Sequence, residues 1–146
     1  MEIREAIEAD KAYIFSLLER TGLTTTGIED VTSFRICQKD GKTAGCFGIV
    51  HSGDGAMLRS FAVEPEMQGT GIGSFMAVQS MKYAIENEIM PMYLLTNTAD
   101  KFFAKFGFVE ITREDIPKIL MDSTALGEYC PCSSVCMKAE KHNAGA

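Results

Sequence analysis

The chain has 146 residues and a mass of 16.0 kDa, which is enough for one hydrophobic core and too little for two. Hydrophobic residues make up 46% and charged residues 23% of the sequence, proportions that exclude disordered and fibrous classes. The 14 basic and 20 acidic residues give a net charge of −6, which argues against nucleic acid or an anionic membrane as a partner.

No stretch is apolar and long enough to cross a bilayer, and the amino-terminal segment MEIREAIEAD lacks the basic and apolar regions of a signal peptide. We therefore expect a cytoplasmic protein, whose five cysteines stay reduced. We also expect a single domain over residues 1–138, followed by a polar tail over residues 139–146.

The first half of the chain predicts one helix and a run of antiparallel strands. Apolar residues recur at helical spacing within Lys11–Arg20, with Asp10 in position to cap this helix and Gly22 to end it. The Asp40–Gly41 pair predicts a tight hairpin turn. The strands expected in this half are Glu2–Ala6, Phe34–Gln38, Ala44–Val50 and Met57–Val63.

The second half predicts a strand–helix–strand crossover. The glycine-spaced loop Gln68–Gly73 leads into a helix whose apolar residues run from Ile72 to Ile89, and Pro91 ends it. The buried strand Met92–Thr96 follows without a hairpin, so it must run parallel to the preceding strand. The fold class is therefore α/β, with one mixed sheet flanked by helices. The remaining elements expected are a helix at Thr98–Phe106, partial helix within Arg113–Tyr129, and strands at Phe108–Ile111 and Val135–Lys138.

The loop Gln68–Gly73 is the most informative element of the sequence. A helix start presents unpaired N–H groups and a partial positive charge, and glycines let a bulky diphosphate approach the backbone closely. The spacing does not fit a Rossmann fingerprint, because Ser74 stands where that motif needs glycine, nor a P-loop, which needs Gly-Lys-Ser/Thr. A glycine-rich turn without a ligand is the alternative, and loop spacing alone does not decide between the two.

Two motifs in the correct order resemble the GCN5-related N-acetyltransferase (GNAT) superfamily. Gln68-x-x-Gly71-x-Gly73 resembles its acetyl-CoA motif, and Asn97–Phe108 (NTADKFFAKFGF) resembles its second cofactor element. The resemblance covers most of the chain, from Ile3 to Met137. Within the superfamily, three segments are similar to the N-acetyltransferases of arsenic-resistance operons, which are in turn similar to the acetyltransferase domain of N-acetylglutamate synthase. They are Leu58–Val63, Leu94–Ala99 and Cys130–Ser134.

The resemblance implies the GNAT fold, a central twisted mixed sheet flanked by helices, and acetyl transfer from acetyl-CoA to an amine. The implied pantetheine site lies between the strands ending at Val63 and Thr96, with the backbone N–H of Val63 polarising the thioester carbonyl. The implied cofactor-binding residues are Phe61, Ala62, Val63, Gln68, Gly69, Thr70, Gly71, Ile72, Gly73, Ser74, Asn97, Phe102, Phe103 and Lys105.

Arg59 is the best candidate for binding the acceptor. It is a lone cation in an apolar strand, and strand alternation predicts that it shares a face with Phe61 and Val63, where its guanidinium could bind a carboxylate. The alternative is an arginine on a sheet edge whose charged end reaches solvent, or an internal salt bridge with Glu64 or Glu66. We expect the acceptor to be an amino acid or a glutamate-like acid, or an arsenical or phosphinic analogue. The substrate-binding residues expected are Arg59, Ser60 and Thr96.

The general acid is where this chain departs from the family pattern. Many family members have a tyrosine where this chain has Phe103, and phenylalanine cannot donate a proton. Tyr93 and Tyr129 are weak candidates, because a tyrosine packed at a sheet edge explains each of them better. We therefore assign no firm general acid.

Cys130, Cys132 and Cys136 form a thiol cluster close to the carboxyl end. Structural zinc needs ligand pairs at longer separation, so we expect buried thiols and no metal. Two rival functions stay open: a thiol-based arsenic or metal-binding protein, and a non-catalytic acyl-CoA sensor, which the absence of a tyrosine at Phe103 favours. The partners expected are a small-molecule amine and, as for many small domains of this kind, a second copy in a homodimer.

Overall fold

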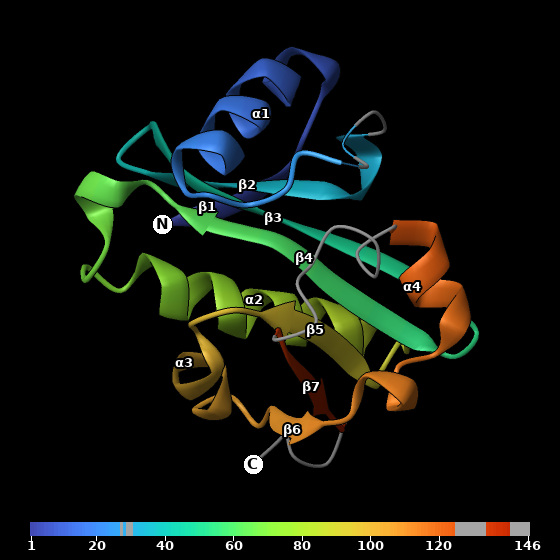
Figure 1. Cartoon of the computed structure of the whole chain (residues 1–146). Helices are drawn as coiled ribbons and strands as arrows, with labels where there is room; N and C mark the ends of the chain where they lie inside the picture. Colours follow the sequence, from blue (N-terminus) through green and yellow to red (C-terminus); the bar gives the residue numbers. More distant parts are fainter. Residues whose placement is uncertain (27, 29–30, 125–133, 141–146) are drawn as a thin grey trace.

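A computed structural model describes residues 1–26, 28, 31–124 and 134–140. One seven-stranded sheet carries helices on both faces (Figure 1). The strands are β1 (Glu2–Glu5), β2 (Phe34–Lys39), β3 (Lys42–Ser52), β4 (Gly55–Val63), β5 (Met92–Thr96), β6 (Val109–Ile111) and β7 (Val135–Ala139). The helices are α1 (Lys11–Arg20), α2 (Ile72–Glu86), α3 (Asp100–Ala104) and α4 (Lys118–Thr124).

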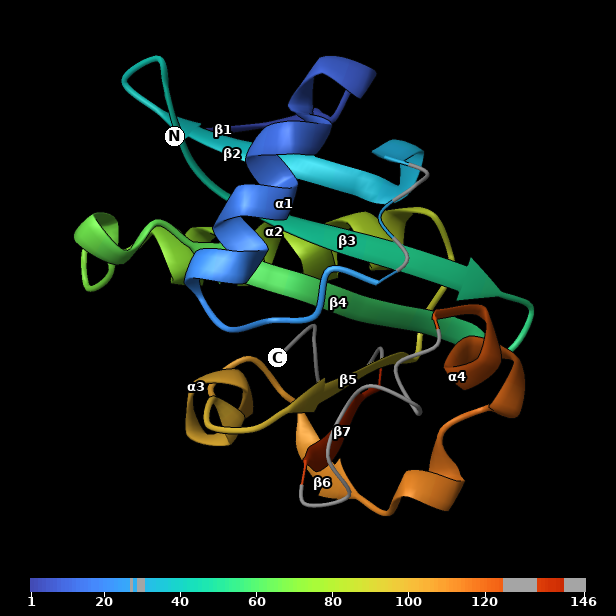
Figure 2. The ribbon, with the colours of Figure 1, turned by 45° about the horizontal axis from the view of Figure 1, so that its top comes forward.

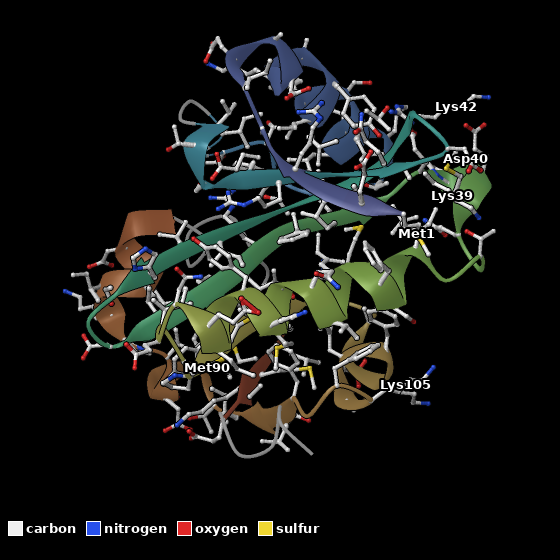
Figure 3. The ribbon with its side chains drawn as sticks, turned by 180° about the vertical axis from the view of Figure 1, so that it is seen from behind. Met1, Lys39, Asp40, Lys42, Met90 and Lys105 are labelled. Carbon is white, nitrogen blue, oxygen red and sulfur yellow. The ribbon has the colours of Figure 1, made fainter. Side chains whose placement is uncertain are left out.

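The sheet has the strand order β1-β2-β3-β4-β5-β7-β6. The pair β4–β5 is parallel, and the other neighbouring pairs are antiparallel. Helix α2 makes the crossover between β4 and β5, so the predicted mixed α/β sheet is confirmed. The predicted hairpin turn is also confirmed: Asp40 and Gly41 have φ values of 54° and 78° and join β2 to β3 (Figure 3).

The helices cover the two faces of the sheet in separate hydrophobic clusters. One cluster lies under α2 and α3 and includes Phe47, Leu58 and Met76. A second lies under α1 and includes Leu17 and Phe34, and a third lies under α4. Figure 2 shows α1 and α4 in front of the sheet and α2 behind it. No helix in the described part of the chain combines the length and apolar composition that a membrane-crossing segment needs.

Two helix boundaries differ from those that the sequence predicts. Helix α2 ends at Glu86 rather than at Pro91, because Glu88 adopts a φ of 57° and the N–H of Ile89 turns back to the carbonyl of Ala84 at 3.0 Å. Helix α3 is shorter than the predicted Thr98–Phe106. Strand β7 extends to Ala139, one residue into the expected tail, and residues 141–146 lie outside the described chain.

Asp10 precedes α1 as predicted, but its side chain does not cap the helix. Its two carboxylate oxygens instead accept hydrogen bonds from the Arg4 guanidinium at 2.7 and 2.8 Å, and one of them also accepts from the N–H of Ile7 at 2.8 Å. A bidentate arginine is a stronger donor set than a single backbone amide, so Asp10 binds Arg4 in place of the N–H groups in the first turn of α1. Gly22 ends α1 as predicted, with a φ of 76°.

Candidate functional site

Strands β4 and β5 are paired over a short length. In the described chain their Cα partners are Ala56 with Met92 and Met57 with Tyr93, and beyond these pairs the strands diverge towards their carboxyl ends (Figure 2). A cavity of about 1050 Å³ is lined by both strands, by the glycine loop and by Thr21–Thr24, which follow α1. This volume lies just above the range of roughly 300–1,000 Å³ that is usual for small-molecule sites.

Most residues that the sequence assigns to a cofactor or an acceptor lie in the wall of this one cavity. Among the others, Ile72 is buried at the start of α2, and the hydroxyl of Thr70 donates to the carbonyl of Met67 at 2.5 Å. Lys105 is exposed and points away from the molecule after α3 (Figure 3). The residues brought together in the wall are Arg59, Ser60, Phe61, Ala62, Val63, Gln68, Gly69, Gly71, Gly73, Ser74, Thr96, Asn97, Phe102 and Phe103.

The start of α2 presents backbone N–H groups next to the glycine loop Gln68–Gly73. Gly71 precedes the helix with a φ of 89°, a left-handed conformation that glycine adopts without steric cost. The first helical hydrogen bond runs from the N–H of Phe75 to the carbonyl of Gly71 at 3.0 Å. The N–H groups at positions 72–74 therefore have no acceptor within the helix, an arrangement that favours an anion at the helix start.

The carboxyl end of β4 turns the peptide group of Val63 towards the cavity. The N–H of Glu64 donates to the carbonyl of Ala44 in β3 at 2.8 Å. Because successive N–H groups of a strand point to opposite edges, the N–H of Val63 points away from β3 and into the opening beside β5. The side-chain amide of Gln68 lies 3.5 Å from the carbonyl oxygen of Val63, which points to the same edge.

A β-bulge interrupts β4 near the cavity. In the β3–β4 register Cys46 pairs with Ala62 and Gly48 with Arg59, so β4 holds one extra residue over this interval. Ser60, within the interval, has a φ of 53°. The inserted residue shifts the alternation of side chains by one position for the rest of the strand.

The bulge overturns the predicted orientation of Arg59. Phe61 and Val63 pack with the cluster under α2. Arg59 lies on the opposite, α1 side, where a Cβ on neighbouring Gly48 would lie 3.3 Å from both the Arg59 Cγ and the ring of Phe34. The prediction that Arg59 shares a face with Phe61 and Val63 is therefore wrong, although all three line the same cavity.

Arg59 links β4 to the segment that follows α1. Its side chain is almost fully buried, its Nε donates to the hydroxyl of Ser60 at 3.0 Å, and an Nη donates to the carbonyl of Thr26. Glu64, one of its two expected internal partners, accepts from Arg20 at 2.6 Å. Arg59 is the single charged side chain among the described residues that line the cavity.

Phe103 belongs to an aromatic cluster that closes one side of the cavity. Its ring centroid lies 5.2 Å from Phe61, 5.0 Å from Phe102 and 5.7 Å from Phe108, each in an edge-on arrangement. Only 5% of the residue is exposed. The position at which many GNAT members carry a tyrosine is thus an apolar packing position in this chain.

Neither of the two tyrosines considered as proton donors is among the described residues that line the cavity. Tyr93 is buried in the cluster under α4 and does not line the cavity. The ammonium group of Lys138 lies 5.7 Å from the centroid of its ring. Tyr129 lies outside the described residues.

The described cysteines are buried free thiols at Cys37, Cys46 and Cys136. Burial raises the pKa of Cys46 to about 12, and its Sγ lies 3.5 Å from the carbonyl oxygen of Ser60 in the bulge. A thiol with such a pKa stays protonated at neutral pH and is a poor metal ligand or nucleophile. Cys130 and Cys132 of the predicted thiol cluster lie outside the described residues.

Besides Leu58, Leu94, Leu95, Thr98 and Ala99, which lie in segments that the sequence analysis named, the sequence prediction missed two further parts of the cavity wall. Thr21–Thr24 line it, and the Thr- and Gly-rich composition of this segment is the signal that could have identified it. Ser134 also lines it and donates a hydrogen bond to Oδ1 of Asn97 at 2.7 Å. The sequence carries no local signal for Ser134, because its partner is 37 residues away.

Comparison with known proteins points to one family. Residues 30–110, more than half of the chain, match the family model described as an acetyltransferase (GNAT) domain. An uncharacterized N-acetyltransferase of Chlorobaculum tepidum is 29% identical over 112 residues, which cover 75% of this chain and 72% of that protein. An amino-acid acetyltransferase of Ralstonia nicotianae is 28% identical over 124 residues, which cover 81% of this chain and 25% of that protein.

The fold is similar to that of N-acetylglutamate synthase from Neisseria gonorrhoeae, solved in complex with coenzyme A and N-acetyl-glutamate. The match has a TM-score of 0.82 at 22% identity and covers 97% of this chain and 35% of that chain. At this identity the likeness shows the fold alone. This chain therefore corresponds to about a third of the Neisseria chain and a quarter of the Ralstonia protein.

Proposed function

This chain belongs to the GNAT family of acetyl-CoA-dependent acetyltransferases, and on that premise we propose that its acceptor is the amino group of an amino acid or a glutamate-like acid. One observation carries the proposal: Arg59 is the single charged side chain in the described cavity wall. A buried guanidinium attracts a carboxylate and repels a cationic polyamine. The relatives named as an amino-acid acetyltransferase and an N-acetylglutamate synthase support the same class of acceptor.

The glycine loop fits the diphosphate of acetyl-CoA. A Cβ at Gly69 or Gly71 would meet no atom within 4 Å, so the loop borders open space in which a bulky group has room. The backbone N–H groups at positions 72–74 hold the pyrophosphate at the helix start. The main-chain groups of Phe61 and Val63 pair with the pantetheine arm in the opening between β4 and β5.

Acetyl-CoA supplies a thioester, from which an acyl group passes to a neutral amine. The N–H of Val63 donates to the carbonyl oxygen on which negative charge develops, and it strengthens as that charge grows. Arg59 binds the carboxylate of the acceptor and so holds its amine near the thioester. No side chain is assigned as proton donor, because Phe103 is packed among aromatic rings and a CoA thiolate leaves without protonation. The proton that the acceptor nitrogen loses as the amide forms passes to solvent water.

The acceptor is tested by measuring thiol release with glutamate, aspartate, neutral amino acids, a phosphinic analogue and a polyamine. Acidic amino acids are the expected substrates. Arg59→Ala should raise the KM for an acidic acceptor by roughly tenfold or more while changing the KM for an amine that has no carboxylate little. Lys118→Ala is the matched control, because this exposed lysine on α4 lies outside the cavity wall.

Turnover of polyamines or peptides alone would contradict the proposed acceptor. So would an Arg59→Ala variant that is folded and has the wild-type KM for acidic acceptors. In that case Arg59 serves only to hold the segment around Thr26 against β4.

The two rival functions predict different outcomes in the same laboratory measurements. An acyl-CoA sensor raises its melting temperature with coenzyme A and turns over no amine. A thiol-based metalloid binder loses arsenite binding, and keeps acetyl transfer, when Cys130, Cys132 and Cys136 are replaced by serine. The arsenic-resistance link, the cytoplasmic location and the homodimer stay predictions.

A further inference from the structure

The carboxyl end of β5 and the amino end of β7 meet at the edge of the cavity. These strands are antiparallel, and their last registered pair on this side is Thr96 with Val135. One step further along the same register, Asn97 stands opposite Ser134, and both residues line the cavity. The hydroxyl of Ser134 donates to Oδ1 of Asn97 at 2.7 Å.

This hydrogen bond determines how the amide of Asn97 is presented. A carboxamide carries one acceptor oxygen and one N–H₂ group with two donors. Because the oxygen accepts from Ser134, the N–H₂ group carries the donors that this amide can offer to a ligand. Ser134 itself is 9% exposed, whereas Asn97 is exposed, so the buried hydroxyl orients an accessible amide.

We propose that Ser134 is a positioning residue, which orients Asn97 so that its N–H₂ group donates to a carbonyl oxygen of the bound coenzyme A arm. This rests on the proposed function, in which coenzyme A occupies the cavity; the family resemblance assigns Asn97 to the cofactor, and Asn97 lines the cavity wall. Without the hydroxyl, the amide can rotate about its side-chain torsions, and binding must then restrict that rotation. Ser134 acts through Asn97 and not on the acetyl group.

The test is a double-mutant cycle with coenzyme A binding measured by titration calorimetry on the full chain. Ser134→Ala and Asn97→Ala should each raise the Kd by roughly 3- to 10-fold, the usual scale for one hydrogen bond. The double variant should bind no more weakly than Asn97→Ala alone, because Ser134 has nothing left to orient. Ser134→Thr keeps the hydroxyl and should restore binding to within about twofold of the wild type.

Thermal melting of each variant separates binding from folding. Additive losses in the cycle, an unchanged Kd in Ser134→Ala, or a Ser134→Thr variant as weak as Ser134→Ala would overturn the proposal. If Ser134→Ala does not fold, Ser134→Thr and Ser134→Gly carry the same comparison. Failure of the wild-type chain to bind coenzyme A would overturn the proposed function, whereas wild-type binding with an additive cycle would overturn this inference alone.

Discussion

Replacing Gly45 with alanine tests how closely β3 supports the part of β4 that lines the cavity. A Cβ at Gly45 would lie 2.6 Å from the carbonyl oxygen of Ala62 and 2.8 Å from Sδ of Met76. Ordinary contacts begin at 3.4 Å, so the separation from the oxygen must grow by 3.4 − 2.6 = 0.8 Å. The Met76 side chain can rotate, but the oxygen belongs to the backbone, and β4 must move with it.

Forcing an extra methyl group into a packed interior costs roughly 1–3 kcal/mol. In a domain of this size each kcal/mol lowers the melting temperature by about 2–4 °C, so Gly45→Ala should melt about 2–12 °C below the wild type. The movement also reaches Val63, the next residue in the cavity wall. We therefore expect weaker coenzyme A binding as well as lower stability.

Thermal unfolding followed by circular dichroism, with coenzyme A titrated into each folded variant, measures both effects. Gly53→Ala is the matched control, because a Cβ at that turn would meet no atom within 4 Å and its φ is compatible with alanine. A Gly45→Ala variant that melts together with Gly53→Ala would refute the reasoning, since β3 and β4 would then be further apart than described.

Three further predictions follow from other parts of the molecule. The Arg4 guanidinium lowers the pKa of Asp10 through its hydrogen bonds, so Asp10→Asn should lower the free energy of unfolding by about 1 kcal/mol at neutral pH. This difference between the variant and the wild type is lost as the pH falls through the folded-state pKa of Asp10. The measurement is a pH series of melting curves, with Glu8→Gln at an exposed position as the control. Gly71→Ala should weaken coenzyme A binding in calorimetry, because a φ of 89° strains alanine by about 1–2 kcal/mol and moves the amides of the helix start. Cys46, whose pKa is about 12, should resist iodoacetamide in the folded protein at pH 8 and react after unfolding, as read by mass spectrometry; labelling of the folded protein would contradict its burial.

The order and type of the elements could be predicted because each depends on a local pattern. The limits of α1 follow from helical spacing between Asp10 and Gly22, and those of β5 follow from an apolar run bounded by Pro91 and Asn97. The parallel pairing of β4 with β5 needs only the length of the connection. The cavity then follows from the position of the glycine loop beside these strands.

The features that could not be predicted depend on contacts between different elements of the fold. The bulge at Ser60 arises from the pairing of β4 with β3 and leaves no mark in the composition, so the orientation of Arg59 was predicted wrongly. The capping role expected of Asp10 was lost to Arg4, which reaches it from β1. Ser134 and Asn97 likewise become neighbours only when β7 joins β5.

The strand order has a consequence for biosynthesis. Strand β7 is the last described strand in the chain, yet it lies between β5 and β6 inside the sheet. A nascent chain that has emerged only as far as β6 has neither a partner for β6 nor the Ser134 side of the cavity wall. Residues up to Ala139 must therefore emerge from the ribosome before a ligand can bind to the complete site. Until then the unpaired edge of β5 is available to chaperones or to other strands.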